Sequence, residues 1–146
     1  MGIDYYCDKQ IGITVTVWDG VVTPEEWREL VRRQDADADW PTGPGFLGVL
    51  STARGLSAFN DSVVEEMRAV YRRRAKQLPR IRSAVVSGQA FGAGPQLEAD
   101  VEDTSGVRNI MFTDVATACT WLGVDVAAVQ PIVDELRAGL RNEPSS

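Results

Sequence analysis

Few of the side chains that usually carry enzyme chemistry are present in this sequence of 146 residues. It contains no histidine, so it lacks the commonest general base, the Ser-His-Asp triad and the imidazole ligands of most transition-metal sites. Two acidic clusters, at 35–39 and 98–103, remain as carboxylate ligands for a cation. Neither has the spacing of an EF-hand loop. We therefore predict no catalytic residues, no metal site and no cofactor.

A glycine-rich segment at 88–94 follows a predicted strand, which is where phosphate-binding loops occur. It lacks the Lys-Ser/Thr ending of a P-loop, and its glycines are misplaced for a dinucleotide-binding fingerprint. We interpret the segment as a turn between a strand and a helix.

Four cations stand close together near the end of a predicted helix: Arg72, Arg73, Arg74 and Lys76. Cations at this end of a helix complement its dipole and need no ligand. The alternative interpretation is an outer patch that binds an acidic or phosphate-bearing partner. The net charge of −6 argues against a dedicated nucleic-acid binder, because such domains are usually basic.

Ser62 is the hydroxyl with the most promising position, at the start of the same helix and directly after Asn60 and Asp61. A phosphate on this serine would be favoured by the free backbone N–H groups and by the helix dipole. The alternative is an ordinary first-turn residue, with Asn60 or Asp61 as the helix cap.

The elements that would position these residues alternate between strands and helices. Segment 13–18 alternates apolar and polar residues, which predicts a strand with one face in solvent. Thr23, Pro24 and Glu26 form a helix start with a capping box. Strands are predicted at 3–7, 11–18, 46–50, 83–87 and 107–112, and helices at 24–34, 61–78, 95–103, 115–122 and 131–141.

This order predicts a single α/β domain over residues 1–146. Its sheet is mostly parallel, with four to five strands, an N-terminal hairpin as an antiparallel edge, and helices packed on it. No apolar run approaches the roughly 20 residues of a membrane helix, and the first residues show no secretory signal. We therefore expect a cytoplasmic protein without a membrane span.

Two stretches carry a resemblance to a known family. Residues 11–20 and 22–26 read Ile-Gly-Ile-Thr-Val-Thr-Val-Trp-Asp-Gly and Val-Thr-Pro-Glu-Glu, a strand followed by a glycine and a helix start. Residues 112–123 read Phe-Thr-Asp-Val-Ala-Thr-Ala-Cys-Thr-Trp-Leu-Gly. Together they resemble the STAS-like superfamily, which includes anti-sigma-factor antagonists and an uncharacterised bacterial STAS/CRAL-TRIO-like branch. The resemblance extends over residues 3–124.

This resemblance implies a function. In the antagonists, the phosphorylated serine lies at the start of a helix after a central strand, so the matching residue here is Ser62, with Asp61 beside it. The resemblance therefore implies a phosphorylation switch at this position. More broadly, it implies a non-catalytic regulatory or scaffold module that binds a protein partner.

Other functions stay open. In the bacterial branch, a gap between helices and sheet admits an apolar ligand, which would make this chain a carrier or sensor. An enzyme that uses Asp61 with Arg54 is a third hypothesis, and the edge strand of the hairpin is a candidate surface for a homodimer. The aromatic residues that would line an apolar cleft, or simply fill the core, are Trp18, Trp27, Trp40, Phe46, Phe59 and Phe91.

Overall fold

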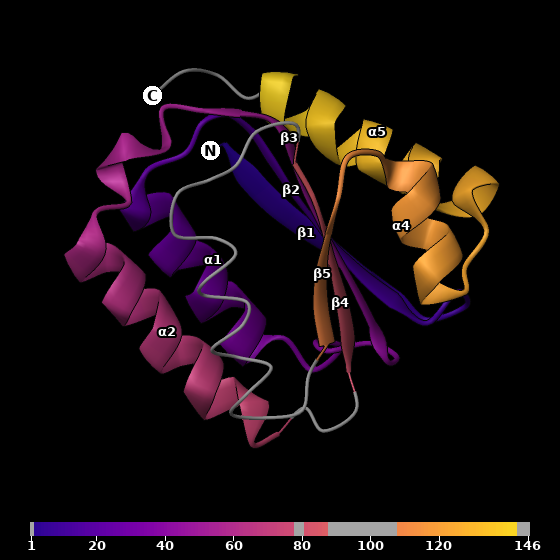
Figure 1. The fold of residues 1–146 in the computed structure, drawn as a ribbon, viewed down its shortest axis with the longest axis horizontal. Helices are drawn as coiled ribbons and strands as arrows, with labels where there is room; N and C mark the ends of the chain where they lie inside the picture. Colours follow the sequence, from indigo (N-terminus) through magenta and orange to yellow (C-terminus); the bar gives the residue numbers. More distant parts are fainter. Residues whose placement is uncertain (1, 78–80, 88–107, 143–146) are drawn as a thin grey trace.

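The computed structural model describes residues 2–77, 81–87 and 108–142. Its strands form one sheet in the order β1-β2-β3-β4-β5, seen almost edge-on in Figure 1. The first pair is antiparallel and the later pairs are parallel, which confirms the predicted α/β sheet with an antiparallel hairpin edge. The strands are β1 (Ile3–Asp8), β2 (Ile13–Val21), β3 (Gly45–Arg54), β4 (Arg82–Val86) and β5 (Arg108–Phe112).

Helices cover both faces of this sheet (Figure 1). The first two, α1 (Pro24–Ala36) and α2 (Asp61–Ala75), lie on one face, and a short 3-10 turn, η1 (Leu56–Ala58), precedes α2. On the other face lie α4 (Val115–Leu122) and α5 (Val126–Asn142). None of the helices in the described ranges is long and apolar enough to cross a membrane.

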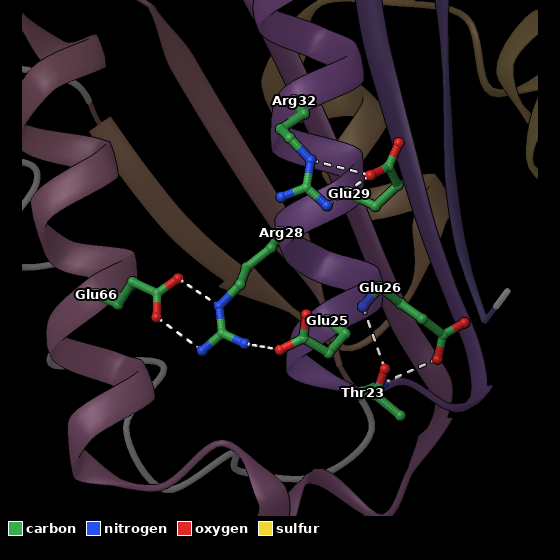
Figure 2. Close-up of polar contacts among 7 residues, drawn as sticks. All are labelled: Thr23, Glu25, Glu26, Arg28, Glu29, Arg32 and Glu66. Atoms are coloured by element: carbon green, nitrogen blue, oxygen red, sulfur yellow. Dashed lines mark hydrogen bonds and ion pairs between the residues drawn. The ribbon is translucent and has the colours of Figure 1, made fainter.

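The start of α1 forms as its sequence predicts. The hydroxyl of Thr23 accepts a hydrogen bond from the backbone N–H of Glu26, and the Glu26 carboxylate accepts one from the backbone N–H of Thr23. Both bonds of this capping box are visible in Figure 2. They satisfy two N–H groups that would otherwise lack an acceptor within the helix.

Strand β2 is buried on both faces, so the predicted solvent-exposed face is wrong. Val15 and Val17, on one face, are fully buried in the core under α4 and α5. Thr14 and Trp18, on the opposite face, are only 1% and 6% exposed. The alternation is real, but Trp18 packs under α1 and α2, Thr14 bonds to Thr42 in the loop after α1, and within 13–18 only Thr16 on this face is half-buried.

Several predicted boundaries are also wrong. Strand β2 runs over Ile13–Val21 rather than 11–18. Strand β3 continues to Arg54, beyond its apolar part, because it stays paired with β2 as far as Val21. Helix α5 begins at Val126 rather than at Pro131, since Asp125 accepts a hydrogen bond from the N–H of Ala127. A proline inside a helix removes one backbone hydrogen bond, and the burial of the apolar face of α5 in the core offsets this loss.

The remaining helices begin and end where their sequence signals predict. Asp114 caps α4 by accepting a hydrogen bond from the N–H of Thr117, and Gly123 ends it with a positive φ of 76°. The predicted helix at 95–103, the glycine-rich segment at 88–94 and the expected stop at Pro79 lie outside the described residues.

Candidate functional site

The start of α2 leaves Ser62 on the surface. Asn60 is the cap, because its side-chain oxygen accepts a hydrogen bond of 3.1 Å from the N–H of Val63. Asp61 and Ser62 are both exposed in the first turn. This settles the cap in favour of Asn60 and leaves Ser62 on the surface.

An exposed apolar side chain lies at the carboxyl end of the sheet, from which η1 leads to α2. Val21, the last residue of β2, is 55% exposed and pairs with Arg54 of β3. Gly55 then turns with a φ of 68°, and a Cβ added to it would lie 3.4 Å from Val21. This end of an α/β sheet is the usual place for binding sites, and here it presents an apolar residue among polar ones.

Asp19 occupies the same end of the sheet, and sequence reasoning did not single it out. Its carboxylate accepts hydrogen bonds of 2.9 and 3.1 Å from Arg141 and one of 2.6 Å from the hydroxyl of Thr52. The hydrogen bonds from Arg141 hold the pKa of Asp19 below its usual value, and the bond from Thr52 adds to this effect. The carboxylate therefore serves to fasten the end of α5 to the sheet.

The predicted aromatic residues fall into two groups on the sheet face under α1 and α2. Trp18 and Phe59 contact each other with ring centroids 5.4 Å apart, and Trp27 packs in the same cluster. Phe46 instead contacts Trp40, with centroids 5.9 Å apart. Phe91 lies outside the described residues.

Between these two groups, the sheet is covered less completely on this face than on the other. Leu47 of β3 and Ala84 of β4, which point toward α4 and α5, are at most 1% exposed. Their neighbours on the α1 and α2 face are all only half-buried: Phe46, Gly48, Leu50, Ser83 and Val85. Among the described residues, a Cβ added to Gly48 would meet within 4 Å a single atom outside its chain neighbours, Leu50 Cδ1 at 3.7 Å.

The predicted outer patch of cations is wrong for Arg74, which is 5% exposed. Its guanidinium donates hydrogen bonds to the side chain of Gln34 at 2.9 Å, to the backbone oxygen of Val31 at 3.2 Å and to Asp35 at 3.0 Å. Its Cζ also lies 4.2 Å from the centroid of the Trp40 ring. Desolvation lowers the pKa of Arg74 below its usual value, and these polar contacts keep the buried charge compensated.

The other three cations of that set do remain outside. Arg72 forms an ion pair with Glu65 at 3.4 Å, and Arg73 forms one with Asp35 at 3.1 Å. Lys76 is exposed. Because acidic side chains pair with both arginines, this surface offers an anionic partner less positive charge than its sequence indicates.

Ion pairs also connect the outer sides of α1 and α2 (Figure 2). Arg28 of α1 binds Glu66 of α2 through two hydrogen bonds of 2.7 and 2.8 Å, and it also contacts Glu25. Arg32 pairs with Glu29 within α1. The bonds between Arg28 and Glu66 join the two helices, and each of these charged side chains has a partner of opposite charge.

The acidic side chains of the cluster at 35–39 also bind other side chains of the protein. Asp37 accepts a hydrogen bond of 2.6 Å from the hydroxyl of Tyr5, and Asp39 pairs with Lys9 at 2.7 Å. Desolvation and the bond to Asp37 raise the pKa of Tyr5. Within the described ranges, no group of three or more acidic, cysteine or histidine side chains could hold a metal ion.

A comparison with solved structures finds an uncharacterised protein of the DUF3478 family from Shewanella loihica PV-4, described as having a SpoIIAA-like fold. The two superpose with a TM-score of 0.55, over 83% of this chain and 94% of that chain. This chain has a SpoIIAA-like fold. The finding confirms the predicted STAS-like architecture, and the 15% sequence identity limits the likeness to the fold. No model of a protein family matches the sequence, and no curated protein matches it.

Proposed function

We propose that this chain is a non-catalytic, cytoplasmic regulatory module that binds a protein partner through the surface around the start of α2. The observation that carries the proposal is the exposure of Asp61 and Ser62 in a helix turn that is capped by Asn60. The exposed Val21 lies at the end of the sheet from which the chain enters this helix. An apolar side chain among polar ones suits a protein interface.

Phosphorylation of Ser62 is the regulatory step of this proposal. A phosphate there would lie in the first turn of α2, where backbone N–H groups and the helix dipole favour negative charge. It would also add its charge and volume to the surface that the partner contacts. We therefore expect the unphosphorylated and phosphorylated forms to bind the partner with different affinities.

Site-specific photo-crosslinking in cells tests the proposed surface. A photo-reactive amino acid at position 62 should trap one protein, whereas the same group at Glu135, an exposed residue of α5 on the opposite side of the sheet, should not. The trapped protein is then titrated with the wild type and with the Ser62→Asp and Ser62→Ala variants. We expect Ser62→Asp to change the dissociation constant at least tenfold, equivalent to about 1.4 kcal/mol, and Ser62→Ala to leave it unchanged.

Two outcomes would contradict this proposal. Crosslinking from position 135 and not from position 62 would place the partner on the other face. Equal affinities for the wild type and Ser62→Asp would remove Ser62 from the switch. Thr120→Asp, a change at an exposed hydroxyl residue of α4 on the opposite face of the sheet, is the charge-matched control and should leave the affinity unchanged.

A second candidate function is carriage or sensing of a small apolar ligand between the sheet and the α1–α2 layer. The half-buried strip through Phe46, Gly48 and Val85 favours it, because central strands are normally covered completely. Native mass spectrometry of freshly purified protein should then detect a bound apolar molecule. Gly48→Val, which adds side-chain atoms to the half-buried strip, should abolish binding, and Ser51→Val, at an exposed position of the same strand, should not. Empty wild-type protein and no thermal shift across a lipid panel would exclude this function.

A further inference from the structure

Strand β1 lies at the edge of the sheet, and its hydrogen-bonding pattern shows which backbone groups face outward. The backbone N–H of Asp19 donates to the oxygen of Gly2 at 2.8 Å. In an antiparallel ladder, hydrogen-bonded pairs alternate with pairs that are not bonded. The register of β1 and β2 therefore directs the N–H and C=O groups of Ile3, Tyr5 and Cys7 away from β2.

The middle one of these three outward donors is already taken. The N–H of Tyr5 donates a hydrogen bond of 2.9 Å to the carboxylate of Asp4. The same carboxylate oxygen accepts a bond of 2.8 Å from Arg33 of α1. The bond to Arg33 therefore keeps the Asp4 carboxylate beside the N–H of Tyr5, at the outer edge of the strand.

Arg33 reaches this edge by passing over Tyr5. Its Cζ lies 5.4 Å from the centroid of the Tyr5 ring, and the ring is fixed at its far end by the hydrogen bond to Asp37. These contacts form one connected group along the edge. It consists of Asp4 and Tyr5 of β1, Arg33 of α1, and Asp37 at the end of α1.

An open edge strand is a template for the addition of another strand. From this geometry we propose that Asp4, held by Arg33, blocks the β1 edge to strand addition. A strand from a second copy of the chain pairs there only after Asp4 releases the N–H of Tyr5. This block acts at the β1 edge and is separate from the binding surface at the start of α2. It also sets a condition on a homodimer formed through the hairpin.

Two variants of Asp4 that lose the same charge test this proposal. In Asp4→Asn, the amide oxygen still accepts the bond from Tyr5, so the variant should have the same oligomeric state as the wild type. In Asp4→Ala, the acceptor is gone, and the variant should dimerise as its concentration rises. Light scattering coupled to size-exclusion chromatography measures the mass, and circular dichroism confirms that each variant is folded.

Hydrogen exchange of the wild type tests the bond itself, without a variant. After correction for sequence effects, the amide of Tyr5 should exchange at least about tenfold more slowly than the outward-facing amide of Cys7. In the Asp4→Ala dimer, both amides should become protected because they pair with the second strand. The proposal is overturned if Asp4→Ala has the wild-type mass at every concentration, if both variants dimerise equally, or if Tyr5 and Cys7 exchange alike in the wild type.

Discussion

Arg74 of α2 stacks on the ring of Trp40, with its Cζ 4.2 Å from the ring centroid. Trp40 in turn contacts Phe46 of β3, and the Arg74 guanidinium bonds to Gln34 and Asp35 in the last turn of α1. One buried cation therefore joins both helices to the sheet near their carboxyl ends. Near the start of α2, apolar contacts such as that between Trp18 and Phe59 have the same effect.

Replacement of Arg74 should destabilise the protein strongly. Arg74→Ala would remove all three hydrogen bonds and the stack on Trp40, and it would leave the buried amide of Gln34 without this donor. We expect a loss of about 3 kcal/mol in the free energy of unfolding, because the change removes a large buried side chain and leaves the buried oxygen of Gln34 without its donor. Asp35 is partly exposed and keeps its bond to Arg73, so it adds little to the loss. Urea denaturation measures the loss.

Two related variants make this prediction specific. Arg72→Ala, at an exposed position, should change the free energy of unfolding by no more than about 0.5 kcal/mol. Arg74→Lys should recover less than half of the loss, since an ammonium cannot reproduce the planar stack and the several directed bonds of a guanidinium. Full recovery by lysine would show that only the charge matters.

The cap of α2 gives a second prediction. Asn60→Ala should lower the free energy of unfolding by about 1 kcal/mol, because the N–H of Val63 loses its acceptor. Asn60→Asp keeps an acceptor at the same position and should retain most of the stability. Equal losses in the two variants would show that the side-chain cap contributes nothing. Chemical denaturation at pH 7 distinguishes these outcomes.

Local signals predicted the element order and most helix starts, because their causes lie within a few residues. Thr23 and Glu26 bond to each other across one turn of backbone. The cap at Asp114 and the left-handed Gly123 that ends α4 depend in the same way on neighbouring residues. Such features require no knowledge of the tertiary fold.

The predictions that were wrong concern burial, because other elements of the fold decide which side chains are covered. Alternation in β2 shows which side chains share a face, but it does not show that α1, α2 and the loop at Thr42 bury Trp18 and Thr14. In the same way, a run of three arginines indicates a charged surface, and only the partners Gln34 and Trp40 turn Arg74 inward. Asp19 escaped notice because its partner, Arg141, lies 122 residues later in the chain.

The two faces of β3 are buried to different extents, and this gives a third prediction. Leu47→Ala, on the fully buried face, should lower the free energy of unfolding by about 3 kcal/mol. Leu50→Ala removes the same atoms from the half-buried face of the same strand, so its loss should be no more than about half as large. Similar losses would mean that the α1–α2 layer covers the sheet as well as α4 and α5 do. Urea midpoints of the two variants decide the matter.

Asp19 gives a prediction for pH. Its carboxyl group has a lowered pKa in the folded state, first because of the hydrogen bonds from Arg141. A lowered pKa means that the carboxylate stabilises the folded state fully above the unfolded value, about 3.9 for Asp. This stabilisation is lost as the pH falls through the folded value.

The Asp19→Asn variant should therefore be less stable than the wild type at pH 7, by about 1.5 kcal/mol, and the gap should narrow below about pH 4. Asp134→Asn removes the same charge at an exposed position in the middle of α5 and should change stability at pH 7 by no more than about 0.5 kcal/mol. Urea midpoints at pH 7, 5, 4 and 3 follow the gap. The bonds from Arg141 are stronger with the ionised carboxylate than with the neutral acid. If the difference in the free energy of unfolding between Asp19→Asn and the wild type is as large at pH 3 as at pH 7, the charge of Asp19 does not hold α5 to the sheet.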